Sequence, residues 1–170
     1  MIEDCQRIIQ KKKNEAYEIA SLAKSKGLDP TTKVEISQAE DLAARVEGLV
    51  GPEGCASEIR KLIKEHGRDR ASLMIMDSIM DKKYGDKTDL ELAEQAVRTA
   101  ITILTEGIVV AGTEGISKLD IRKNQDGTKY IAIFFASPIR SAGGTAGGYA
   151  TMLADYVRKK FQQLRPFLGN

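Results

Sequence analysis

The spacing of apolar residues changes once along this chain, near Gly112, and that change limits the folds open to it. Before it, apolar residues mostly recur every three or four positions, the period of an amphipathic helix. After it, Leu119 and Ile121 alternate with charged residues, as in a half-buried strand. The sequence therefore predicts an α+β fold, with a helical region over residues 1–110 and a β-hairpin, glycine-rich loop and C-terminal helix over residues 111–170.

The first two helices are predicted from their apolar stripes and end signals. Residues 3–26 have mostly helical spacing and stop at Gly27, because glycine is a frequent helix terminator. Ser37 and Glu40 form the capping-box pattern that starts the next helix. The apolar positions of this second helix are Leu42, Ala43, Val46, Leu49 and Val50.

Three more helices complete the predicted helical region. One ends at His66, and a methionine-rich helix follows over residues 70–83, for which core packing is favoured over a partner surface. The last has the clearest signals, because Thr88 and Glu91 form a second capping box ahead of a long helical stripe. We expect this helix over residues 89–106.

A β-hairpin is predicted from the turn residues between two strand-like segments. Asp126 and Gly127 supply the Asp-Gly pair that is a good hairpin signal. The second strand, residues 129–136, is apolar along its length, so we expect it to be buried and to end at Pro138. A helix follows the glycine-rich loop, and its predicted apolar side consists of Tyr149, Met152, Leu153, Tyr156, Val157, Phe161 and Leu164.

Few side chains in this sequence suit catalysis or metal binding. Cys5, Cys55 and His66 cannot form an ordinary zinc site, and no nucleophile–base pair stands out. Asp77 and Asp81 lie one helical turn apart, a spacing that suits a metal ion, but a surface role is favoured. The low cysteine count and the lack of a signal peptide predict a cytoplasmic protein. No apolar segment approaches the roughly 20 residues that span a bilayer, so no membrane association is expected.

The positive charge of the chain is concentrated near its C-terminus. The formal net charge is +2, but residues 116–170 contain nine Lys or Arg and three Asp or Glu, which leaves a net −4 for residues 1–115. A basic final third favours an anionic partner, most simply nucleic acid. The alternative is a solvated, lysine-rich surface with no partner.

The segment Ser-Pro-Ile-Arg-Ser-Ala-Gly-Gly-Thr-Ala-Gly-Gly, residues 137–148, joins the second predicted strand to the last helix. Glycines let backbone amides approach a ligand, and the first amides of a helix favour phosphate or carboxylate. Thr145 is well placed as the helix N-cap, and Arg140 and Ser141 could donate to the same anion. The alternative is a structural turn whose glycines only permit tight packing. The segment is neither a Walker A loop nor GxGxxG, and its Gly-x-x-Gly spacing is a weak match to KH domains.

The string FFASPIRSAGGTAGGYATMLADYVRKKF resembles the large subunit of archaeal family D DNA polymerases, which have an Ala-Gly-Pro-Ile-Arg-Ser-Ala-Gly-Gly-Thr segment between a strand and a helix. Residues 14–54 resemble the family's N-terminal helices, and residues 91–135 resemble the segment that leads into the motif. Ser137 departs from the family's glycine, and Gly147 and Gly148 stand where larger residues are expected. The apolar C-terminal residues have little to pack against downstream, so we expect a fragment of a longer protein.

The resemblance implies a two-subunit replicative enzyme, a DNA-directed DNA polymerase that extends a primer on template DNA with dNTPs and Mg²⁺. It implies that the catalytic aspartates lie downstream in the large subunit, so this fragment alone is expected to be inactive and to hold no cofactor. It also implies a small subunit with 3′–5′ exonuclease activity and a sliding clamp as partners, beside the remainder of the large subunit and primer–template DNA.

Two hypotheses follow for this fragment, beside the disfavoured one of an independent small enzyme that binds a phosphorylated ligand. The first is a non-catalytic domain that acts in subunit assembly and DNA binding. The second is a structural scaffold that makes no DNA contact and self-associates through apolar surface. The candidate phosphate-binding residues of the first hypothesis are Arg140, Ser141, Gly143, Gly144, Thr145, Lys129, Arg158, Lys159 and Lys160.

Overall fold

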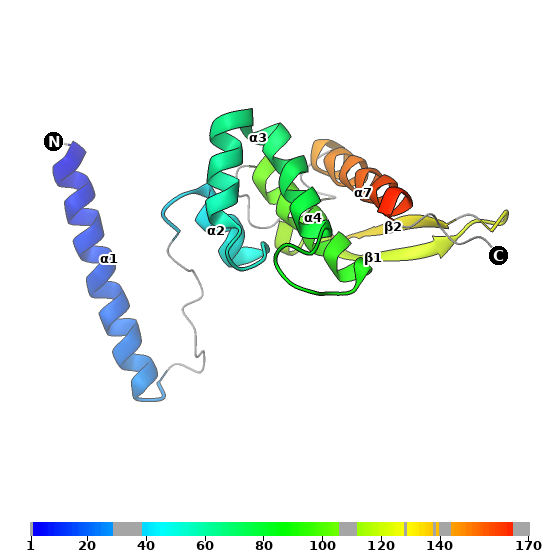
Figure 1. Cartoon of the computed structure of the whole chain (residues 1–170). Coiled ribbons are helices and arrows are strands. Elements are labelled where there is room, and N and C mark those ends of the chain that lie inside the picture. The colour runs from blue at the N-terminus through cyan, green and yellow to red at the C-terminus, as the bar shows by residue number, and fades with distance from the viewer. Residues whose placement is uncertain are drawn as a thin grey trace. The chain divides into compact units, whose positions relative to one another are not determined.

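The computed structural model describes residues 2–28, 39–105, 112–127, 129–137, 139 and 144–164, without the side chains of residues 2, 3, 6 and 162–164. The chain divides into two compact units, residues 1–38 and 39–170. The elements in chain order are α1 (Ile2–Ser25), α2 (Leu42–Leu49), α3 (Ala56–Met80), α4 (Asp89–Leu104), β1 (Ile116–Lys123), β2 (Lys129–Phe135) and α7 (Gly144–Leu164) (Figure 1). This arrangement confirms the predicted α+β class, whereas the division at residue 110 stays a prediction.

Helix α1 is the described element of the first unit. It ends as predicted at Gly27, which has a left-handed φ of 68°. The amide of Gly27 donates to the carbonyl of Lys24 at 3.0 Å, and the amide of Leu28 donates to that of Ala23 at 3.0 Å, the pair of bonds that defines a Schellman cap. Four apolar side chains of this helix are more than half exposed: Ile8, Ile9, Ile19 and Leu22.

Helix α4 is the centre of the second unit. It contacts α2, α3, α7 and β1. Its N-terminus has the predicted capping box, in which the Thr88 side chain accepts from the Glu91 amide and the Glu91 carboxylate accepts from the Thr88 amide. Small residues let its neighbours approach closely, which is why α4 can be surrounded on several sides. The buried residues that line it include Ala93, Ala96, Val97, Ala100 and Ile101.

Helix α2 begins later than the sequence predicts. Its N-cap is Asp41, whose carboxylate accepts from the Ala44 amide at 2.8 Å, and the expected cap Ser37 lies outside the described residues. Asp41 also accepts from Arg60 of α3 at 2.6 Å, so it performs two tasks that serine cannot combine. The hydrogen bond from Arg60 is the main cause that lowers the pKa of Asp41.

Helix α3 consists of two helical segments that meet at Gly67. That residue has φ 76° and ψ 168°, a conformation that favours glycine and breaks the helix as the sequence predicts after His66. The methionine-rich second segment packs in the core, because Met76 and Met80 are buried. The two segments are joined by Glu58, whose carboxylate accepts hydrogen bonds from Ser78, Lys83 and Tyr84.

Glu58 gives the fold a stability that depends on pH. Burial raises the pKa of Glu58, but hydrogen bonds from Lys83, Tyr84 and Ser78 outweigh burial and leave the pKa below its usual 4.5. A lowered carboxyl pKa stabilises the folded state above about pH 4.5, and this contribution is lost as the pH falls through the folded-state pKa. We expect Glu58→Gln to lower the free energy of unfolding by roughly 1–2 kcal/mol at pH 7. Urea unfolding of both proteins between pH 7 and acid should show the two stabilities converging below pH 4.5; a constant difference would contradict this role.

The hairpin has the predicted position but less burial than expected. Strands β1 and β2 pair antiparallel, with Leu119 opposite Ile133 and Ile121 opposite Ile131. The predicted buried strand is wrong in this respect, because every residue of β2 is half-buried or exposed. The sheet has only these two strands among the described residues, and packing against α4 and α7 covers one of its faces.

Helix α7 packs on α4 and β2 with a face that matches the predicted one only in part. Leu153 and Val157 are buried as expected, but Tyr149 is 38% exposed and Met152 is 50% exposed. Alanines take their place, because small side chains allow close approach to α4. The buried alanines of α7 are Ala146, Ala150 and Ala154.

Arg98 of α4 connects this helix to the segment that leads into β1. Its guanidinium pairs with Glu94 one turn earlier, at 2.8 Å, and the other oxygen of Glu94 accepts from the Leu119 amide at 3.3 Å. The guanidinium also donates to three backbone carbonyls, two before β1 and one within it. These carbonyls belong to Gly112 at 3.0 Å, Thr113 at 2.6 Å and Ser117 at 3.3 Å.

Candidate nucleic-acid interface

The start of α7 is the described part of the predicted phosphate site. Arg140, Ser141 and Gly143 lie outside the described residues, whereas Gly144 and Thr145 are the first two residues of the helix and both are exposed. The expectation of Thr145 as N-cap is wrong, because it lies inside the helix. The first turn of α7 has no acidic residue, so no carboxylate of that turn opposes an anion at the positive end of the helix dipole.

The glycines of this helix are not required by packing. A Cβ at Gly144 or Gly148 would meet no atom within 4 Å, and one at Gly147 would reach the Ile139 side chain at 3.9 Å, an ordinary contact. None of the three has a left-handed φ. The alternative interpretation, that glycine serves tight packing, therefore lacks support at these three positions. Since glycine destabilises a helix relative to alanine, Gly144 fits a role outside the fold itself.

The basic residues near the end of α7 are paired within the chain. Arg158 donates to Asp155 at 2.8 Å and 2.6 Å, and Lys159 lies 3.1 Å from the other oxygen of the same carboxylate. The hydrogen bond from Arg158, followed by that from Lys159, lowers the pKa of Asp155. A phosphate at this place would compete with Asp155 for both cations. Arg158 and Lys159 are therefore weaker phosphate donors than the sequence alone indicates.

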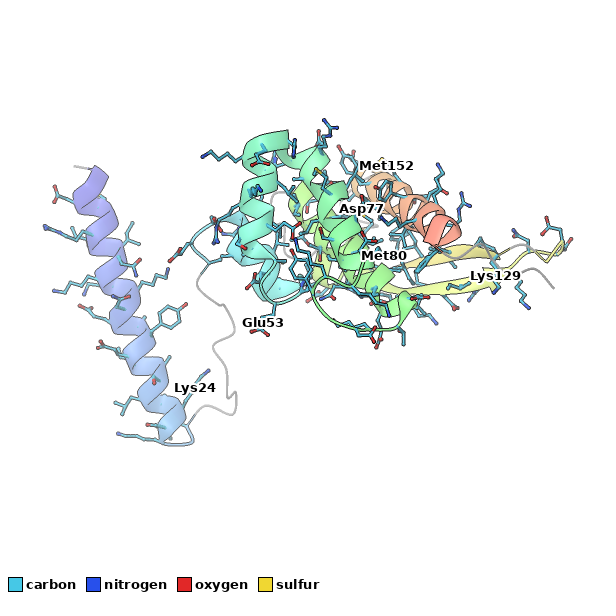
Figure 2. All side chains as sticks on the ribbon, in the orientation of Figure 1. Lys24, Glu53, Asp77, Met80, Lys129 and Met152 are labelled. Carbon is cyan, nitrogen blue, oxygen red and sulfur yellow. The ribbon has the colours of Figure 1, made fainter. Side chains whose placement is uncertain are left out.

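Lys160 is directed toward α3 rather than toward a ligand. Its ammonium lies 3.3 Å from Asp77 and 3.4 Å from Asp81, the two carboxylates whose spacing in the sequence suits a metal ion. The Tyr156 hydroxyl donates to Asp77 at 2.9 Å, and burial followed by this bond raises the pKa of Tyr156. This cluster fixes α7 on α3. Figure 2 shows Asp77 on the helix that lies beside α7.

A groove of about 350 Å³ separates β2 from α7. It is lined mainly by apolar atoms, with Asp155 and Arg158 on its α7 side. Lys129, the remaining predicted phosphate ligand, begins β2 and is exposed, and Figure 2 places it toward the tip of the hairpin. The predicted basic residues are thus distributed over the hairpin tip and the second half of α7, and the structure does not bring them together with Gly144 in one described cluster.

Sequence reasoning passed over two exposed cations of β1, Lys118 and Arg122. Both lie within 5 Å of the Phe134 ring on the neighbouring strand. The alternation along β1 could have found them, because it places them on the face opposite Leu119 and Ile121.

Comparison with known proteins identifies the family. Residues 4–167 match the family described as DNA polymerase II large subunit DP2, N-terminal. The chain belongs to this family. It is 51% identical over 156 residues to the DNA polymerase II large subunit of Pyrococcus horikoshii, covering 90% of this chain and 11% of that protein. The corresponding subunit of Methanococcus vannielii is 51% identical over 146 residues, covering 86% of this chain and 13% of that protein.

The chain therefore corresponds to the N-terminal region of a DNA polymerase II large subunit and spans only about a tenth of the length of these relatives. Within the part that the structure describes, no three His, Cys, Asp or Glu side chains come together so that they could hold a metal ion. Across those same residues, no helix has both the length and the apolar character needed to cross a bilayer.

Proposed function

We propose that this chain is a non-catalytic N-terminal domain of the large, polymerizing subunit of a replicative archaeal DNA polymerase, and that it binds DNA and takes part in subunit assembly. The family match supports the placement within the large subunit. The DNA-binding part is carried by one observation, the exposed start of α7, where the chain has Gly144 although a Cβ would fit there.

The parent enzyme in this proposal is a DNA-directed DNA polymerase with Mg²⁺, a 3′–5′ exonuclease subunit and a sliding clamp as a further partner. Mg²⁺ would be held by other parts of the large subunit, because the described carboxylates do not form a metal cluster. Two carboxylates of α7 and its neighbour α3 already form ion pairs. Asp155 pairs with Arg158 and Lys159, and Asp77 pairs with Lys160. The work of this domain is then to hold other components in place.

Assembly is supported by the exposed apolar side of α1. Ile8, Ile9 and Ile19 are 58%, 65% and 70% exposed. A helix that exposes several large apolar side chains gains free energy when a partner covers them. We propose that α1 contacts the rest of the polymerase, either the remainder of the large subunit or the small subunit.

Binding to primer–template DNA tests the DNA-binding part. We expect fluorescence anisotropy to show binding that weakens steeply with salt, as phosphate contacts require. Gly144→Ala should weaken binding several-fold, because a Cβ would obstruct the approach of phosphate to the helix amides. Gly148→Ala is the matched control: it also has room for a Cβ, so it should raise the free energy of unfolding by up to about 1 kcal/mol and leave DNA affinity unchanged. Arg140→Ala should weaken binding without unfolding the chain.

The alternative is a scaffold without DNA contact. It predicts that neither the wild type nor the Gly144→Ala variant binds DNA at low salt while both stay folded. It also predicts self-association, which analytical ultracentrifugation would detect as a concentration-dependent increase in mass. That combination of results would replace the DNA-binding proposal for this chain.

A further inference from the structure

One face of the β-hairpin combines cations with aromatic rings. The register places Lys118 opposite Phe134 and Arg122 opposite Tyr130, with Asp120 between the two cations. Because side chains alternate along a strand, these residues share a face, which we call the outer face. Leu119 and the residues that share its side of the sheet pack toward α4 and α7, so the outer face is directed away from the core.

Phe134 organises the two cations of the outer face. The Lys118 ammonium and the Arg122 guanidinium each lie 4.9 Å from the centre of its ring. Because both cations contact the same ring, their charges lie within about 10 Å of each other. Arg122 forms an ion pair with Asp120 at 3.4 Å, and its side chain stays 50% exposed. A phosphate at Arg122 would compete with Asp120, but this ion pair is longer than the 2.6 Å and 2.8 Å bonds that hold Arg158 to Asp155, so the competition is weaker here.

Tyr130, which also lines the groove between β2 and α7, adds an aromatic surface beside the cations. It lies opposite Arg122 and is 37% exposed. At the tip of the hairpin Lys123 is opposite Lys129 and both are exposed; the alternation places this pair on the other side of the sheet, so its positive charge lies near the outer face without belonging to it. Exposed aromatic rings interleaved with cations are the combination by which proteins bind single-stranded nucleic acid, since the cations contact phosphates and the rings stack on bases.

We propose that the outer face of the hairpin binds single-stranded nucleic acid without sequence preference. Lys118 and Arg122 contact the phosphates, and Tyr130 stacks on an unpaired base. Duplex DNA is the less suitable occupant, because its bases are already stacked on each other and offer no free face to Tyr130. The outer face also has no Asn or Gln that could read base edges. This inference rests on the proposed DNA-binding function and gives it a second surface, separate from the start of α7.

The test compares matched variants of the whole chain by fluorescence anisotropy, with labelled oligothymidylate and its duplex with oligoadenylate across a salt series. Lys118→Gln/Arg122→Gln should weaken single-strand binding about tenfold and reduce the slope of log affinity against log salt by roughly 1.4. Lys61→Gln/Lys64→Gln removes the same charge from exposed positions of α3 and should change affinity less than about twofold.

The aromatic contact is tested in the same assay. Tyr130→Ala should lower the affinity for single strands about tenfold, whereas Tyr149→Ala, which removes a tyrosine of nearly the same exposure from α7, should have little effect on affinity. Circular dichroism would establish that each variant is folded.

The outcomes separate this inference from the proposed function. If the wild type binds single strands and the hairpin variants bind equally well, the outer face is not the site, while DNA binding itself stands. If Tyr149→Ala weakens binding and Tyr130→Ala does not, the contact belongs to α7. Duplex binding that falls as much as single-strand binding would overturn the preference for single strands. If the wild type binds neither ligand at low salt, both the proposed DNA binding and this inference fail.

Discussion

Replacing Arg98 with alanine should lower the free energy of unfolding by about 3 kcal/mol. The Arg98 side chain is only 18% exposed, and it supplies the counter-charge of Glu94 and donors to three backbone carbonyls. Removing it leaves a half-buried carboxylate and several acceptors without their partner. The expected fall in melting temperature is about 6–12 °C for a chain of this size, measured by differential scanning calorimetry.

Arg98→Lys is the control that separates charge from geometry. Lysine keeps the positive charge, but its single ammonium cannot reach Glu94 and the carbonyls of Gly112 and Thr113 together, as the planar guanidinium does. We therefore expect Arg98→Lys to recover less than half of the lost stability. Full recovery of the lost stability by Arg98→Lys would show that the positive charge alone is needed. That result would contradict the role of the planar guanidinium.

Gly112→Ala should lower the free energy of unfolding by about 2–3 kcal/mol. A Cβ at this position would lie 1.8 Å from the Thr102 hydroxyl and 3.1 Å from the Arg98 carbonyl, so the segment would have to move away from α4. That movement would also disturb the bond from Arg98 to the Gly112 carbonyl. Equilibrium urea unfolding measures the cost.

A double-mutant cycle with Thr102→Ala tests the cause of this effect. Thr102→Ala removes the hydroxyl that the new Cβ would meet, so Gly112→Ala should cost clearly less in that background. Equal costs in both backgrounds would locate the strain elsewhere, for example in the approach to the Arg98 carbonyl. Gly148→Ala is the contrasting case. A Cβ at Gly148 would meet no atom within 4 Å, so we expect this substitution to raise the free energy of unfolding slightly.

Local signals were sufficient for most of the elements. The capping box at Thr88, the helix end at Gly27 and the break at Gly67 were predicted and observed, because each depends on a few adjacent residues and the backbone angles that they favour. The hairpin was found for the same reason, through the Asp-Gly pair that ends at Gly127. The resemblance of the sequence to the polymerase family was also confirmed by the family match over residues 4–167.

The candidate site was predicted less completely. Gly144 and Thr145 were identified from the sequence, and the structure adds that they begin an exposed helix end. The pairing of Lys160 with Asp77 joins positions more than 80 residues apart, so no local pattern reveals it. The two cations near Phe134 lie on the face of β1 that the alternation marks as polar, but their proximity to this ring depends on the pairing of the two strands, which no local pattern reveals.

The sequence by itself determined which segments form helices and strands, several of the signals that end them, and to which family the chain belongs. Tertiary structure decided which side of each element is buried. It turned alanines of α7 inward in place of Tyr149 and Met152, and it left β2 half-exposed. The physical reason is that element type follows from local backbone preferences, whereas burial depends on how closely neighbouring elements can approach. The small residues of α4 set that approach, and they act only when distant parts of the chain are brought together.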